Sequence, residues 1–143
     1  MGVRGLTNYV NLIGSLWTQI ELRNTKLVID GPNLYSVLYM DNDFDRRCGG
    51  EYDKFYYIVL SFFDALDSKG VESFVILDGA HDSSNKKLDT FLERAVERIQ
   101  TADALSKGSR AANNDVFLLP LLSNLVFVQA LRDRGIKFAV ADK

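Results

Sequence analysis

The sequence has 143 residues, of which 47% are hydrophobic and 25% charged, and its formal net charge at pH 7 is −2. These values are typical of one soluble globular domain and exclude a disordered or low-complexity chain. The single cysteine, Cys48, excludes a disulfide framework and a cysteine-rich zinc site. Because the net charge is slightly negative, any site for a polyanion such as DNA has to be local. The apolar runs are far shorter than a membrane span, so no membrane partner is expected.

The first half of the chain predicts a strand, a short helix, a polar loop and a long helix. Lys26–Asp30 (KLVID) is a short apolar run closed by Asp-Gly-Pro-Asn, which indicates a buried strand and a turn. Asn33 is expected to cap a short helix over 33–39. Residues 41–53 form an acidic, polar loop, and helical spacing of apolar residues predicts a helix over 52–69, which the next glycine ends.

The second half predicts two strands separated by two helices. Ser73–Asp78 (SFVILD) indicates a second buried strand, again followed by glycine. Helices are expected over 84–107 and from about 115 to 134, the latter with Pro120 in its first turns. Ile136–Val140 (IKFAV) indicates the third strand.

This alternation of strands and helices predicts an α/β fold with right-handed crossovers and a mostly parallel sheet. Because parallel sheets are covered on both faces, apolar strands without alternation favour a three-layer α/β/α arrangement. The sequence ends shortly after the third expected strand, so residues 1–143 are interpreted as one part of a domain truncated after that strand.

Two aspartates stand at matching positions in this predicted sheet. Asp30 and Asp78 each end a strand and each precede a glycine. The carboxyl ends of parallel strands form the edge at which open α/β sheets bind ligands, and neighbouring strands lie about 4.8 Å apart. Two close carboxylates repel each other unless a hard cation such as Mg²⁺ or Mn²⁺ lies between them. The alternative is that each aspartate caps the turn or helix that follows it.

The helix over 84–107 has segregated charges. At 100° per residue, Lys87, Arg94 and Arg98 share one stripe beside an apolar stripe. Such a basic row next to a carboxylate edge is suited to nucleic-acid phosphates near a metal. The alternative is a solvated amphipathic helix with ion pairs within it.

Other catalytic patterns are missing or incomplete. His81 is the only histidine, so no Ser-His-Asp or Cys-His pairing is supported, and its own role stays open between metal ligand, proton carrier and solvated residue. The chain contains neither a GxxxxGK[ST] nor a GxGxxG phosphate-binding loop.

The start MGVRGL, the strand end VIDG (28–31) and the strand end ILDG (76–79) occur in this order. Together they resemble the N-terminal region of the flap endonuclease and xeroderma pigmentosum group G nuclease superfamily, which has a PIN-like fold. Within that superfamily the chain is similar to the asteroid family along essentially its whole length. The segments that carry this similarity are LVIDGPNLY, GGEYDKF, KKLDTFLERAVERIQ and VFVQALRDRGIKFAV.

The resemblance implies roles for particular residues. Asp30 and Asp78 would be the first two carboxylates of a cluster that binds Mg²⁺ or Mn²⁺. Lys87 and Arg94 resemble a basic gateway pair that steers the scissile phosphate, although their offset from the second aspartate departs by two residues from the flap endonuclease pattern. Gly2 would lie close to DNA. Tyr35 stands one position from the place of a base-stacking tyrosine in flap endonucleases.

The resemblance also implies an activity: metal-dependent hydrolysis of DNA phosphodiesters at flaps, overhangs or single strands, in DNA repair inside the cell, in the nucleus. Such nucleases carry further acids after the third strand, and Asp142 comes too early to replace them. Since two-metal hydrolysis needs a larger cluster, this N-terminal half is expected to be inactive alone. The alternative is a non-catalytic PIN-like regulatory module linked to receptor signalling, whose protein partners the sequence does not identify.

Overall fold

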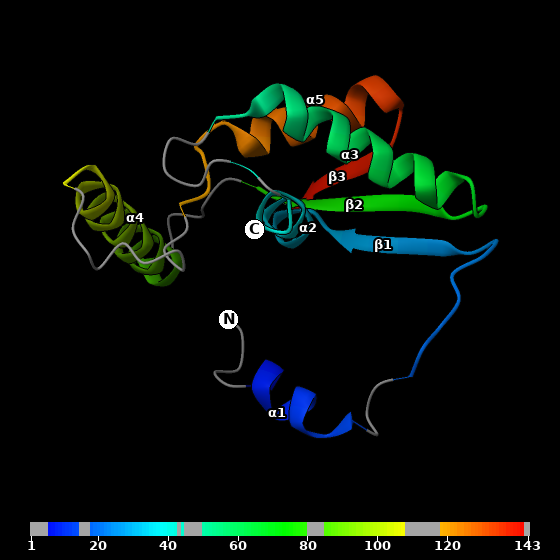
Figure 1. The fold of residues 1–143 in the computed structure, drawn as a ribbon, viewed down its shortest axis with the longest axis horizontal. Coiled ribbons are helices and arrows are strands. Elements are labelled where there is room, and N and C mark those ends of the chain that lie inside the picture. Colours follow the sequence, from blue (N-terminus) through cyan, green and yellow to red (C-terminus); the bar gives the residue numbers. More distant parts are fainter. Residues whose placement is uncertain are drawn as a thin grey trace.

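The computed structural model describes residues 6–14, 18–42, 44, 50–79, 85–107 and 118–141 of the chain. Its helices and strands follow one another as shown in Figure 1. In chain order they are α1 (Leu6–Leu12), β1 (Lys26–Asp30), α2 (Gly31–Met40), α3 (Tyr52–Asp67), β2 (Glu72–Asp78), α4 (Asn85–Ser106), α5 (Ser123–Arg134) and β3 (Lys137–Ala141). None of the helices in the described ranges is long and apolar enough to cross a membrane.

The strands form a parallel sheet in the order β1-β2-β3, which confirms the α/β class and the parallel pairing. The register places Asp30 of β1 opposite Ile76 of β2, and Asp78 of β2 opposite Ala141 of β3. Each strand is connected to the next through helices, as parallel neighbours require, because a tight turn cannot return the chain to the same end of the sheet. All carboxyl ends therefore lie at one edge.

In the described part of the chain, helices cover one face of this sheet, so the expected three-layer arrangement is not found. Along β2, Val75 and Leu77 are buried, whereas Phe74 and Ile76 between them are 38% and 41% exposed. On β1, Val28 is 65% exposed on the same open face. Apolar strand residues do not by themselves reveal which face is covered, because successive side chains point to opposite faces and only tertiary packing decides.

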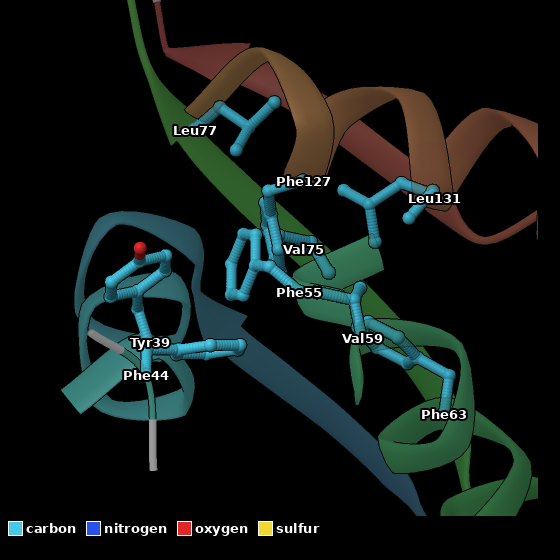
Figure 2. Packing of buried hydrophobic residues seen from close by; sticks show 10 residues of the cluster. Tyr39, Phe44, Phe55, Val59, Phe63, Val75, Leu77, Phe127 and Leu131 are labelled. Atoms are coloured by element: carbon cyan, nitrogen blue, oxygen red, sulfur yellow. The ribbon is translucent and has the colours of Figure 1, made fainter. Parts of the chain in front are cut away.

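The core lies between the covered face and helices α2, α3 and α5. Phe55, Val59 and Phe63 of α3 recur at every fourth position and are almost completely buried. Figure 2 shows them packed with Phe127 and Leu131 of α5 over β2. Each such side chain contributes about 1.5–3 kcal/mol through burial. The core thus anchors the two long helices and, through them, the strand ends.

Helices α3 and α5 are also joined at their ends by charge. Arg134 donates from Nε to Asp64 and from Nη2 to Asp67, at 2.7 Å in both cases. Helix α5 ends at Gly135, whose φ of 71° is the left-handed conformation typical of a helix C-terminus. By contrast, α1 and α4 stand apart from this helical layer (Figure 1).

Two predicted helix starts are wrong, and each has a local cause. Helix α2 begins at Gly31 rather than at Asn33, because Asp30 itself caps the helix. Helix α5 begins at Ser123, well after residue 115, and residues 115–117 lie outside the described ranges. Pro120 has no N–H to donate, and its carbonyl instead accepts from the Ser123 N–H at 3.1 Å, in a turn that precedes the helix. The short helix α1 was not predicted.

Candidate functional site

Asp30 and Asp78 lie at the carboxyl edge of the sheet and on its same face. Asp30 is level with Ile76, and Asp78 follows two residues later on the neighbouring strand, so both project on the open side. Two residues of strand advance about 6.6 Å and strands lie about 4.8 Å apart, which separates the two Cα atoms by about 8 Å. The sequence therefore placed both acids at one edge correctly, and the structure adds that they are staggered.

Asp30 has a second task in the structure. One of its carboxylate oxygens, Oδ1, accepts a hydrogen bond of 3.0 Å from the Asn33 N–H and caps α2. A carboxylate at this position also complements the positive end of the helix dipole. The capping interpretation is thus correct for Asp30, yet its second oxygen takes no part in the cap and the side chain is exposed.

The glycine after each aspartate has a steric reason. A Cβ atom on Gly31 would come within 2.6 Å of Leu77 Cδ2 and 3.0 Å of the Ile76 carbonyl oxygen. A Cβ atom on Gly79 would come within 2.3 Å of the Ala141 carbonyl oxygen, which accepts the Gly79 N–H at 3.1 Å. The glycine that follows each aspartate therefore lets the backbone pass close to the neighbouring strand, immediately after the residue that carries the carboxylate.

Tyr35 lies in the electric field of the two acids and of Arg98. Burial raises the pKa of the Tyr35 hydroxyl above its ordinary value of 10.0, the Arg98 charge opposes this rise, and Asp78 and Asp30 add to it. The hydroxyl therefore stays protonated at neutral pH and keeps a proton to donate. The Tyr35 ring packs on Phe127, with ring centres 5.7 Å apart, so its orientation depends on the core.

Helix α4 lies beyond the carboxyl ends of the strands (Figure 1). Its Arg98 donates from Nη2 to the Leu119 carbonyl oxygen at 2.9 Å, which ties the helix to the segment that precedes α5. Arg94 is exposed one turn earlier. The apolar stripe of α4 is exposed too: Val96 is 51% and Ile99 69% accessible. The amphipathic helix was predicted correctly, but its apolar side does not face the sheet.

Several expected site residues cannot be placed. Gly2, His81 and Asp142 lie outside the described residues. Lys87 belongs to α4, but the structure describes no more of it than its backbone. Their assignments therefore stay predictions from the sequence.

A cavity of about 250 Å³ opens beside Tyr35 and Asp78, between α2, α5 and the ends of β2 and β3. Sequence patterns did not reveal the two polar residues that α5 contributes to this cavity, Asn124 and Arg132. They lie eight positions apart with Val128 midway, so all three share one face of the helix. That spacing was the available signal, but it mixes polar, apolar and charged side chains and does not stand out as a motif.

The two aspartates fit a small divalent cation. Mg²⁺ is commonly held by one or two carboxylates, with waters and substrate phosphates completing its shell, and both side chains here are exposed at one edge. Within the described ranges, no group of three or more His, Cys, Asp or Glu side chains is arranged to hold a metal. The arrangement thus suits one loosely bound ion.

Comparison with known proteins identifies relatives along most of the chain. It is 41% identical over 132 residues to the human single-strand DNA endonuclease ASTE1, and 38% identical over 136 residues to the protein of that name from Danio rerio. It is 36% identical over 138 residues to protein asteroid from Drosophila melanogaster. These alignments cover 92%, 92% and 95% of this chain.

The chain spans less than a fifth of the length of these relatives, namely 19%, 18% and 15%. No family model matches the chain, and no solved structure matches it. The similarity to asteroid proteins is therefore confirmed, whereas the PIN-like fold stays a prediction.

Proposed function

We propose that this chain carries part of the active site of a divalent-metal-dependent endonuclease that cleaves single-stranded DNA. The observation that carries the proposal is the position of Asp30 and Asp78, which share one edge and one face of the sheet beside Tyr35 and Arg98. Relatives named single-strand DNA endonuclease support the substrate class. Flaps and overhangs, which also expose single strands, are further candidate substrates.

In this proposal each residue has a defined task. Asp30 and Asp78 hold Mg²⁺ or Mn²⁺, and Asp30 also fixes the start of α2. A bound cation would supply charge stabilisation for the scissile phosphate and a more acidic water. Lys87 and Arg94 attract neighbouring phosphates, and Arg98 keeps α4 next to the edge through its bond to Leu119.

The same geometry sets a limit on catalysis. Two cations about 3.5–4 Å apart stabilise both the attacking and the leaving oxygen in two-metal hydrolysis. Two staggered carboxylates supply ligands for one ion, and the described residues contain no larger acidic group. We therefore expect these 143 residues to bind DNA and one cation without significant cleavage.

A cleavage and binding assay tests the proposal. Purified chain is incubated with labelled single-stranded, flap and overhang DNA in Mg²⁺ or Mn²⁺, and binding is followed by fluorescence anisotropy as salt is raised. We expect binding that weakens steeply with salt. The Lys87→Ala, Arg94→Ala double variant should lower the slope of log affinity against log salt by roughly 1.4, because two single-strand phosphate contacts are lost.

Lys69→Ala, at the opposite end of the sheet, removes a charge without touching the site and serves as the matched control. An unchanged slope in the double variant would remove the gateway assignment. Cleavage that disappears in Asp78→Ala would show that two carboxylates suffice, and would correct the expectation of inactivity.

The second candidate is a non-catalytic regulatory module. It is favoured by the lack of a third metal-binding carboxylate among the described residues. Absence of both Mn²⁺ binding and DNA binding would favour this candidate over the nuclease.

A further inference from the structure

The cavity beside Asp78 has the composition of a specific binding site. Its inner wall is apolar and combines side chains of β2 and β3 with Pro32 of α2; the strand residues are Leu77, Phe138 and Val140. Tyr35 adds an aromatic ring, and Asn124 and Arg132 add an amide and a cation. Apolar walls with a few convergent polar groups are typical of small-ligand sites.

The polar groups of α5 are available for a ligand. In the part of the chain that the structure describes, the side chains of Asn124 and Arg132 have no hydrogen bond or ion pair. Arg134, two residues later, bonds to two aspartates, and Gln129 donates to Asp133 at 2.7 Å. Arg134 and Gln129, which lie outside the cavity, thus have partners within the fold, whereas the two polar residues of α5 that line it are left for another partner.

Size and charge restrict that partner. About 250 Å³ is smaller than the ~300–1,000 Å³ of sites for drug-sized molecules, so the cavity suits a single planar ring system. Asp78 and the nearby Asp30 disfavour a free anion, and the exposed guanidinium of Arg132 disfavours a purely apolar guest. A neutral heteroaromatic ring with hydrogen-bonding edges satisfies all of these constraints.

We propose that this cavity accepts one unpaired nucleobase, a purine by preference, from the strand whose phosphate lies at Asp30 and Asp78; the inference rests on the proposed function. Asparagine reads adenine and arginine reads guanine through paired hydrogen bonds, so Asn124 and Arg132 both favour purines. Tyr35 provides a stacking surface. A base paired within a duplex cannot enter the cavity, so the site selects single-stranded or extruded nucleotides.

Binding without metal tests this inference independently of catalysis. The full chain in EDTA is titrated with three single-stranded dodecamers, dA12, dT12 and a fully abasic strand with the same phosphates. The three nucleic acids differ in bases alone, so phosphate contacts cancel in the comparison. We expect dA12 to bind about tenfold more tightly than the abasic strand, since stacking one base contributes about 1–3 kcal/mol, with dT12 between them.

Substitutions of residues that line the cavity show whether the base preference arises there. Val128→Trp fills the cavity and should bring all three strands to the affinity of the abasic one, whereas Leu125→Trp, on an exposed position of the same helix, should leave the differences intact. Asn124→Ala alters an exposed side chain, so it does not threaten the fold, and it should reduce the preference for dA12 over dT12 because asparagine pairs with adenine. Circular dichroism confirms that each variant is folded.

Equal affinity of wild type for dA12 and the abasic strand would overturn the inference, and so would a base preference that survives in Val128→Trp. Titration of Mn²⁺ into wild type and into the Asp30→Asn and Asp78→Asn variants tests the proposed function separately. Base-dependent DNA binding without Mn²⁺ binding would support the nucleobase site and contradict the proposed nuclease function. Mn²⁺ binding without any base dependence would support the nuclease function and contradict the nucleobase site.

Discussion

The charged side chains at the two ends of the parallel sheet are arranged differently. At the amino end, Glu72 lies between two lysines: its Oε1 is 2.7 Å from Lys137 Nζ and its Oε2 is 3.8 Å from Lys26 Nζ. These three residues come from all three strands, and the one carboxylate is shared by the two lysines. At the carboxyl end, the two aspartates share one edge, and Arg98, whose charge acts on Tyr35, donates to a backbone carbonyl.

The charges at the amino end are paired across the sheet, whereas the acids at the carboxyl end are assigned to a ligand only in the proposed function. Exposed ion pairs such as those of Glu72 add little stability but favour one strand register over a slipped one. Two carboxylates that share one edge repel each other unless a hydrogen bond or a positive charge compensates them. In the proposed function, a cation bound at that edge would lower the repulsion between the two acids.

The largest expected effect is loss of metal binding. Asp78→Asn and Asp30→Asn should each weaken Mn²⁺ binding by on the order of a hundredfold, because a unit charge about 4 Å from the ion contributes ~1–4 kcal/mol. Electron paramagnetic resonance of free Mn²⁺ measures the affinity. Glu72→Gln removes an acid at the other end of the sheet and should leave the affinity unchanged. An equal loss of Mn²⁺ affinity in all three variants would show that the acids at the two ends of the sheet contribute equally to Mn²⁺ binding.

The next effect concerns the close backbone approach behind Asp30. Gly31→Ala should lower the free energy of unfolding by about 1–3 kcal/mol, since its Cβ would meet Leu77 and the Ile76 carbonyl oxygen. Gly14→Ala is the control, because no atom lies within 4 Å of the added group. Urea denaturation measures both. If Gly31→Ala and Gly14→Ala have similar free energies of unfolding, the start of α2 shifts to make room for the added Cβ without destabilising the fold.

The cap of α2 separates the structural role of Asp30 from its charge. Asp30→Ala should lower stability by about 1 kcal/mol relative to Asp30→Asn, because asparagine still accepts the Asn33 N–H whereas alanine cannot. Both substitutions should weaken Mn²⁺ binding alike. Thermal denaturation in EDTA measures the stability difference, and equal stability of the two variants would argue against the cap.

The smallest effect belongs to the amino end. The hydrogen bond and charge of Lys137 hold the pKa of Glu72 below its ordinary value of 4.5, so Lys137→Ala should raise that pKa. A lowered pKa stabilises the fold above 4.5 and loses this contribution as pH falls through the folded-state value. The small stability gap between wild type and variant should therefore close in acid. The Glu72 carboxyl resonance followed by NMR against pH provides the check.

Sequence patterns predicted the core helices better than the loop beside them. Phe55, Val59 and Phe63 repeat at helical spacing, so their burial in α3 follows from the pattern. Phe44 lies in the segment predicted as a polar loop, yet it is buried and stacks on Tyr39 with ring centres 4.5 Å apart. A single aromatic residue among acids carries no periodicity, and the partner that buries it comes from another element.

By itself, the sequence determined the three strands, their parallel pairing and the acids at the ends of two of them, because apolar runs and the Asp-Gly pairs that close two of these runs are local signals. Only the tertiary structure decided which face of the sheet is covered, how far Asp78 extends past Asp30, and that Asn124 and Arg132 meet Tyr35 at one cavity. These features depend on packing between elements distant in sequence: α5 lies over the strands because its Phe127 and Leu131 fill the core. No short segment of the chain encodes that placement.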